Sequence, residues 1–162
     1  MKTEMKPEFG LSTIVNHYTE GDNAHGAHVS PIFQTTTFGF PDVETMDAIF
    51  SGQQPGYVYS RSENPNVDQL GDKYAYLEGL DLIRQRPGVD PKEILAGKAV
   101  SSGMAAISAA VLGRVRAGDT VITQRDLYGN SFGFFHNFAP RFSINVVWVD
   151  GNSIEAWEAA FS

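Results

Sequence analysis

The spacing of apolar side chains predicts two helices in the first half of the chain. A short helix is expected after Asp42, and a longer one begins at Asn64, with Pro65 in its first turn and Gly79 at its end. Within the longer segment, apolar positions recur every three or four residues: Val67, Leu70, Tyr74 and Leu77. This period is typical of a helix with one apolar side.

After residue 95 the pattern becomes regular and alternates between strand and helix. The expected elements are strands over 97–101, 119–124 and 143–150, and helices over 104–116 and 129–138. Such alternation predicts a parallel sheet with right-handed crossovers. One more helix is expected near the end of the sequence, with Asn152 as its N-cap and Ile154, Trp157 and Phe161 at helical spacing.

Two other stretches lack this regularity. Residues 1–41 show little periodicity, and SPIFQTTTFGF at 30–40 is expected to be extended because threonine and phenylalanine dominate it. We therefore expect an extended N-terminal arm over residues 1–63, interrupted by the short helix after Asp42. Residues 81–95 are polar, contain two prolines and are expected to form a surface excursion.

Charge and composition narrow the class of protein. The 162 residues include 12 basic and 19 acidic side chains, which give a net charge of -7, and the basic residues do not cluster. We therefore expect neither a nucleic acid nor a membrane as partner. The sequence contains no cysteine, no start typical of a signal peptide and no apolar run long enough for a membrane helix. Together these features predict a cytoplasmic protein.

Two loops that follow predicted strands are the first candidates for a binding site. Ser101–Met104 comes after the strand at 97–101, and Asp126–Gly129 comes after the strand at 119–124. In a parallel sheet both loops are expected at the carboxyl edge, where ligands bind. A serine and Gly103 at a helix start favour an anion, although they equally suit an ordinary serine cap on a tightly packed helix.

The segment PGYVYSRSENP offers a second group of candidates. Tyr57, Tyr59 and Arg61 alternate along a stretch that is expected to be extended, so their side chains can point to the same side. The Arg61 guanidinium has a geometry that suits a phosphate or a carboxylate. His25 and His28 lie close together in the sequence, but no third ligand is near them, so no metal site is expected.

Four segments of the chain, taken together, are more specific than any of these patterns alone. They are PIFQTTTFGF at 31–40, YVYSRSENPNVDQLGDKYAYLEG at 57–79, SSGMAAISAAVL at 101–112 and GDTVITQRDLYGNSFGFF at 118–135. In this order they resemble the Cys/Met metabolism family of pyridoxal-phosphate-dependent enzymes, which includes cystathionine γ-synthases and γ-lyases, methionine γ-lyases and O-acetylhomoserine sulfhydrylases. The resemblance implies an α/β, aspartate-aminotransferase-like fold (fold type I). Residues 1–63 would then be the arm, and 64–162 the first part of the large cofactor-binding domain.

The resemblance also implies roles for individual residues. One segment matches the part of the family that holds the phosphate of pyridoxal 5'-phosphate, the expected cofactor: Ser102, Gly103 and Met104. Tyr128 matches the catalytic tyrosine that stacks on the pyridine ring and moves protons. Tyr59 and Arg61 match a pair that reaches the cofactor phosphate of the neighbouring subunit. The implied active site is therefore completed by a second copy of the chain, in a homotetramer built of dimers.

The implied reaction is γ-elimination or γ-replacement on a sulfur amino acid or an activated homoserine, with the cofactor as electron sink. The family's cofactor-bound lysine lies in a Ser-x-Thr-Lys-like segment that this sequence lacks, and the five lysines present lie in other contexts. We therefore expect the N-terminal part of such an enzyme, inactive by itself, with the lysine beyond residue 162. The alternative is a truncated or split, non-catalytic chain that packs with another polypeptide.

Two further observations bear on the choice of class. Methionine γ-lyases typically carry a cysteine shortly after the ring-stacking tyrosine, whereas Gly129, Asn130 and Ser131 follow it here, which weakens that assignment within the family. A nucleotide-binding α/β domain would need a phosphate loop or a Gly-x-Gly-x-x-Gly turn, and the sequence contains neither. The resemblance to pyridoxal-phosphate enzymes therefore remains the favoured interpretation.

Overall fold

The chain divides into two compact units, residues 1–99 and 100–162. The computed structural model describes residues 5–18, 23 and 25–161. Within this described part, no helix is both long enough and apolar enough to cross a membrane.

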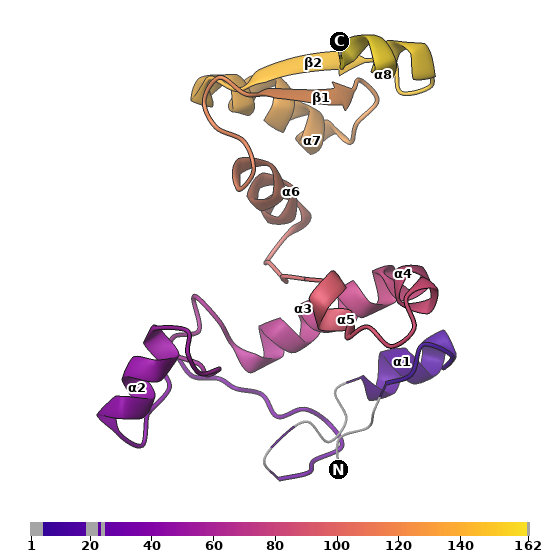
Figure 1. The fold of residues 1–162 in the computed structure, drawn as a ribbon. Helices are drawn as coiled ribbons and strands as arrows, with labels where there is room; N and C mark the ends of the chain where they lie inside the picture. The colour runs from indigo at the N-terminus through magenta and orange to yellow at the C-terminus, as the bar shows by residue number, and fades with distance from the viewer. Residues whose placement is uncertain (1–4, 19–22, 24, 162) are drawn as a thin grey trace. The chain divides into compact units, whose positions relative to one another are not determined.

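The first unit is helical. Its elements, in chain order, are α1 (Leu11–His17), α2 (Val43–Phe50), α3 (Pro65–Glu78), α4 (Leu80–Gln85) and α5 (Pro91–Ile94) (Figure 1). α2 begins as predicted, because the Asp42 carboxylate accepts a hydrogen bond from the Thr45 N–H at 2.7 Å. α3 also begins as predicted, with Asn64 as its N-cap and Pro65 in its first turn, and it ends at the expected Gly79.

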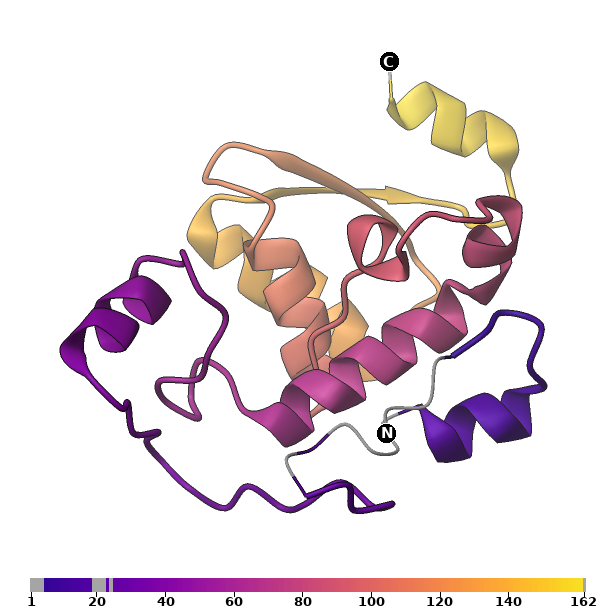
Figure 2. The same cartoon turned by 60° about the horizontal axis from the view of Figure 1, so that its bottom comes forward.

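A small core joins α1 to α3 and α4. Ile14 of α1 is fully buried and clusters with Tyr76, Leu80 and Ile83, and α1 lies beside α3 (Figure 2). Two expectations are wrong here. The arm contains a helix that its pattern does not show, because burial of a single side chain stabilises α1. Residues 81–95 are not simply a surface excursion, because Ile83 of α4 belongs to the core.

Three of the four apolar positions from which α3 was predicted do not lie on its buried face. Val67, Leu70 and Tyr74 are 37%, 47% and 61% exposed. Gly71 is buried instead, and a Cβ at this position would lie 2.6 Å from the carbonyl oxygen of Gly97. The backbone of α3 therefore contacts the backbone of the segment after α5, which an alanine at either position would obstruct.

The second unit carries the parallel strands. Its elements are α6 (Gly103–Leu112), β1 (Thr120–Gln124), α7 (Gly129–Gly133), a π-helical turn η1 (Phe134–Phe138), a 3-10 turn η2 (Ala139–Phe142), β2 (Asn145–Val149) and α8 (Ile154–Ala160). β1 and β2 pair in parallel, with Val121 opposite Val146, as the alternation of strand and helix predicts. The Phe132 ring of α7 lies 5.0 Å from the Trp148 ring of β2, so the helix packs against the strand pair (Figure 1).

The strand expected over residues 97–101 is absent. These residues form neither helix nor strand, and β1 with β2 makes up the sheet of the described chain. A strand depends on a hydrogen-bonded neighbour, which local propensity does not supply. The prediction that Ser101–Met104 follows a strand of the sheet is therefore wrong for the structure described.

The remaining helices differ from expectation at their ends. The helix expected over 104–116 ends at Leu112. The expected helix over 129–138 is present, but its second half winds as the π-helical turn η1. The last helix is capped by Ser153, whose Oγ accepts from the Ala156 N–H at 3.1 Å, and not by Asn152. Serine and asparagine are similarly good N-caps, so composition alone does not choose between neighbours.

Candidate functional site

Tyr59 and Arg61 lie on the same side of the segment that precedes α3, as their alternating spacing predicts. The Arg61 Cζ atom stands 5.0 Å from the centre of the Tyr59 ring, which is a cation–π contact. Both side chains are exposed, Tyr59 by 36%. The guanidinium therefore stands against an aromatic face with its N–H groups open to an anion.

The arm holds this segment through backbone pairing. Thr37 and Tyr59 form an isolated antiparallel bridge, and the Ser60 N–H donates to the Thr36 carbonyl at 2.9 Å. The extended conformation expected for residues 30–40 is thus used to pair with the residues around Tyr59. This pairing links two of the four segments that carry the family resemblance.

The start of α6 has the features of an anion site. Ser102 is the N-cap, and its Oγ accepts from the Ala105 N–H at 3.1 Å. The N–H groups of Gly103 and Met104 lie in the first turn, where an α-helix has no internal acceptor. Gly103 is exposed, and a Cβ there would meet nothing within 4 Å. The serine thus acts as a cap, while the helix start stays open to a negatively charged group.

Tyr128 stands at the start of α7, after β1. Its side chain is 78% exposed, and its carbonyl accepts from the Phe132 N–H at 2.9 Å. The loop before it is held by Gln124, whose Nε2 donates to the Asp126 carbonyl at 2.7 Å. The phenol ring and its hydroxyl are therefore presented outward from a loop with defined internal bonds.

These residues form two groups, one in each unit. Tyr59 and Arg61 belong to the first unit, whereas the α6 start and Tyr128 belong to the second. Their chemistry fits pyridoxal phosphate. The guanidinium and the open helix start suit a phosphate, and the exposed phenol suits the face of a pyridine ring.

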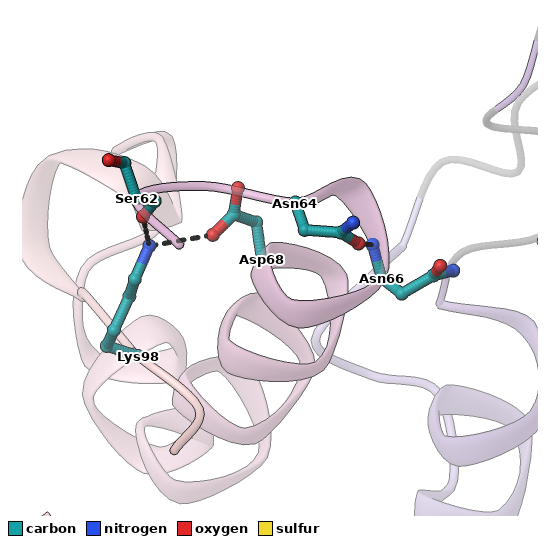
Figure 3. Close-up of polar contacts among 5 residues, drawn as sticks. All are labelled: Ser62, Asn64, Asn66, Asp68 and Lys98. Atoms are coloured by element: carbon teal, nitrogen blue, oxygen red, sulfur yellow. Dashed lines mark hydrogen bonds and ion pairs between the residues drawn. The ribbon is translucent and has the colours of Figure 1, made fainter. Parts of the chain in front are cut away.

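The sequence patterns did not indicate the polar side chains that bond to the arm and to the residues on either side of Tyr59 and Arg61. Asn64 was predicted as the start of the longer helix, but its contacts with the arm, and those of Asn66, were not expected. Lys98 was likewise not expected to bond, yet its Nζ lies 3.3 Å from the Ser62 carbonyl and 2.9 Å from the Asp68 carboxylate (Figure 3). The two asparagines could have been noticed from their place at and just after the start of the helix. A capping bond uses only the side-chain oxygen, so the amide N–H donors are left for other partners.

Several other polar side chains of the described chain have structural partners. Lys73 Nζ donates to the Val15 carbonyl at 3.0 Å, and Lys92 pairs with Asp72 at 3.3 Å. The His136 ring stacks on Phe132. Among the residues that the structure describes, no group of three potential ligands from His, Asp or Glu is close enough to hold a metal ion.

The fold and these residues define a class, that of the fold type I α/β proteins that depend on pyridoxal phosphate. Within it, the chain belongs to the family described as Cys/Met metabolism PLP-dependent enzyme, whose model matches residues 12–162. The family resemblance, the fold class and the cofactor inferred from the sequence are thereby confirmed.

Individual relatives agree with this placement. An L-methionine gamma-lyase from Porphyromonas gingivalis is 36% identical over 160 residues, which are 99% of this chain and 37% of the relative. A homocysteine/cysteine synthase from Saccharomyces cerevisiae is 36% identical over 87% of this chain and 29% of its own length. The chain therefore spans about a third of the length of the curated relatives it matches.

Solved structures of enzymes from the same group are similar in fold to this chain. A cystathionine gamma synthase from Xanthomonas oryzae pv. oryzae has a TM-score of 0.73 and 25% identity, covering 98% of this chain and 35% of that one. A Campylobacter jejuni structure has a TM-score of 0.81 and 26% identity, covering 96% of this chain and 34% of that one. The latter carries N'-pyridoxyl-lysine-5'-monophosphate at position 205 of its own chain.

Proposed function

We propose that this chain is the N-terminal part of an enzyme that uses pyridoxal phosphate to eliminate or replace the γ-substituent of a sulfur amino acid or an activated homoserine. The observation that carries the proposal is the open start of α6, with its Ser102 cap and exposed Gly103, in a chain that the family model matches from residue 12 to 162. The relatives include both lyases and synthases, so the proposal covers elimination and replacement alike.

The phosphate would be held mainly by the chain's backbone. The N–H groups of Gly103 and Met104 and the hydroxyl of Ser102 would bind its oxygens at the positive end of the α6 dipole. Tyr59 and Arg61 would reach the phosphate bound by a neighbouring subunit. A guanidinium adds a charge-assisted, two-pronged contact that fixes the orientation of the group as well as its affinity.

Tyr128 would act on the ring side of the same site. When bound, pyridoxal phosphate supplies the electron sink that makes the substrate's C–H and γ-bonds labile. The Tyr128 ring would cover the pyridine face, and its hydroxyl would hold and pass on a proton during substrate exchange or at the departing γ-group. The high exposure of this side chain leaves room for both.

The lysine that binds the cofactor would lie outside these 162 residues. Lys73, Lys92 and Lys98 each have a structural partner, and the modified lysine of the Campylobacter jejuni relative has a position number above 162. We also propose that residues 64–162 begin the cofactor-binding domain after an N-terminal arm. The complete enzyme would be a cytoplasmic homotetramer built of two dimers.

The test is a substrate assay on the full-length protein. It would be loaded with pyridoxal phosphate and given L-methionine, L-cystathionine, or O-acetylhomoserine with sulfide. The proposal expects a keto acid with ammonia from elimination, or a new thioether or thiol amino acid from replacement. The 162-residue chain alone serves as the control and is expected to be inactive.

A loaded protein that turns over none of these substrates would contradict the proposed function. It would favour the alternative interpretation, a non-catalytic chain that packs with another polypeptide. Activity that appears only after a separate lysine-bearing polypeptide is added would instead identify a split enzyme.

A further inference from the structure

The side chain of Asn64 does more than cap α3. Its Oδ1 accepts from the Asn66 N–H at 3.0 Å, which is the cap itself. Its Nδ2 donates to the Phe33 carbonyl at 3.0 Å and to the Ser60 Oγ at 3.0 Å. Asn64 is 8% exposed, so these bonds form where water cannot replace them. One amide therefore joins the helix start, the arm and the segment that carries Arg61.

Ser60 continues this connection. Besides accepting from Asn64, its Oγ donates to the Thr35 carbonyl, and its N–H donates to the Thr36 carbonyl at 2.9 Å. Ser60 lies between the two residues of the cation–π pair. The backbone from which Tyr59 and Arg61 project is thus tied to the arm through both the main chain and the side chain of the residue between them.

Asn66 and Lys98 support the same region from either end. Asn66 Nδ2 donates to the Pro31 carbonyl at 2.7 Å, and its Oδ1 accepts from the Phe33 N–H at 2.8 Å, which fixes the arm to α3. Lys98 bonds to the carbonyl of Ser62, the residue after Arg61 (Figure 3). Lys98 is 55% exposed, so its contribution is expected to be smaller than that of the buried amides.

We propose that Asn64 is a positioning residue that holds Tyr59 and Arg61 in place for the anion they bind. The inference rests on the proposed function, in which that anion is the cofactor phosphate. An amide is required because the side chain accepts a hydrogen bond from one partner and donates to two others. Aspartate keeps the acceptor but has no donor, and serine keeps a capping oxygen but is too short to replace the amide nitrogen.

The test uses the full-length protein and two ligands, pyridoxal phosphate and pyridoxal, which differ by the phosphate that Arg61 is proposed to bind. The variants are Asn64→Ser, Asn64→Asp, Arg61→Ala and the double variant Asn64→Ser with Arg61→Ala. Asn145→Ser is the matched control, because Asn145 also donates from its amide to a backbone carbonyl, that of Gly118 at 3.1 Å, but lies in β2. Dissociation constants are measured for both ligands.

The inference predicts that Asn64→Ser and Asn64→Asp weaken binding of pyridoxal phosphate by about fivefold, as expected for a lost hydrogen bond of about 1 kcal/mol. Binding of pyridoxal should be unchanged. In the Arg61→Ala background, Asn64→Ser should have a smaller effect than in the wild type, because only Tyr59 of the two groups that it positions is left. Asn145→Ser should change neither constant.

Hydrogen exchange gives a readout that does not depend on the ligand. The Ser60 and Phe38 N–H groups, which donate to Thr36 and Val58, should exchange about tenfold faster in the Asn64 variants and at the wild-type rate in Asn145→Ser. Unchanged exchange at these two amides would overturn the role of Asn64 in holding the segment.

The ligand results separate this inference from the proposed function. If Arg61→Ala weakens binding of pyridoxal phosphate but Asn64→Ser does not, the proposed function stands and the positioning role is wrong. The positioning role is also wrong if Asn64→Ser weakens both ligands equally, or if its effect adds fully to that of Arg61→Ala. If Arg61→Ala itself leaves both constants unchanged, Arg61 does not bind the phosphate and the positioning role is wrong, while the proposed function is still decided by the substrate assay.

Discussion

At the scale of single residues, Tyr128 combines two functions that a substitution can separate. Tyr128→Phe keeps the aromatic ring at an exposed position and removes the hydroxyl. We expect cofactor binding in the full-length enzyme to be nearly unchanged and the turnover number to fall by about 100- to 10,000-fold, the usual range for a general acid–base group. Steady-state kinetics and cofactor titration measure the two effects. An unchanged turnover number would show that Tyr128 only packs.

Tyr76 is a core residue whose buried position is unfavourable for its polar hydroxyl. The ring is 4% exposed and lies 5.2 Å from the Tyr18 ring, and its hydroxyl has no hydrogen-bond partner among the described residues. Burial is the main cause that raises the pKa of Tyr76 above its ordinary value of 10.0. The nearby charge of Glu8 is the second cause and also raises this pKa. The folded state therefore disfavours the phenolate.

We expect Tyr76→Phe to leave the protein as stable as the wild type at neutral pH or to stabilise it by about 1 kcal/mol, since no bond to the hydroxyl is lost. A raised pKa in the folded state means that stability is intact below the unfolded pKa, near 10, and declines as the pH rises through the higher folded value. The stability of the Tyr76→Phe variant should decline less over this pH range. Thermal unfolding between pH 7 and pH 11 tests this, and a lower midpoint for the variant at pH 7 would contradict it.

At the scale of elements, α3 depends on a contact between two backbones. Gly71→Ala would place a methyl group 2.6 Å from the Gly97 carbonyl oxygen and 2.9 Å from its carbon. Neither is a flexible side chain, so the helix or the segment after α5 must shift. We expect a loss of about 1–3 kcal/mol in the free energy of unfolding, as for other overpacked sites.

Gly133→Ala is the matched control for this prediction. Gly133 has helical angles, with φ -59° and ψ -36°, and a Cβ there would meet nothing within 4 Å. It should be neutral or slightly stabilising, because alanine favours a helix more than glycine does. Chemical denaturation measures the free energy of unfolding of both variants. If the Gly71→Ala and Gly133→Ala variants were equally stable, the backbone contact at Gly71 would accommodate a methyl group without a loss of stability.

The elements that sequence patterns predicted correctly are those with local causes. The caps at Asp42 and Asn64 bond to N–H groups two or three residues away, so the signal lies within one turn. The strand expected at 97–101, which is absent, would need a neighbour along the sheet, and α1 depends on burying Ile14 against residues more than 60 positions later. Local pattern contains neither kind of information.

The same distinction holds for the site. The shared side of Tyr59 and Arg61 follows from their alternation, so it could be predicted. The side-chain amides of Asn64 and Asn66 donate to carbonyls 31 and 35 positions earlier in the chain, and although the residue type marks these two asparagines, no spacing in the sequence indicates which carbonyls they bind. The roles assigned by resemblance stay predictions until cofactor binding is measured.

At the scale of the whole molecule, Arg61 is expected to serve a neighbouring subunit. Arg61→Ala chains would be mixed with chains that lack the cofactor-binding lysine, each inactive alone. In a mixed dimer, one site takes its lysine from the first chain and its arginine from the second, so part of the activity should return. A mixed dimer that forms but stays inactive would place Arg61 at its own subunit's site or at none.

The central claim is that these residues hold a cofactor whose lysine lies elsewhere in the protein. The most direct test is to load the full-length protein with pyridoxal phosphate, reduce it with borohydride and locate the pyridoxyl group by peptide mapping. We predict an absorbance band that reduction abolishes and a pyridoxyl group on a lysine beyond Ser162. A protein that shows no such band, or a label on any of the five lysines of these 162 residues, would contradict the account.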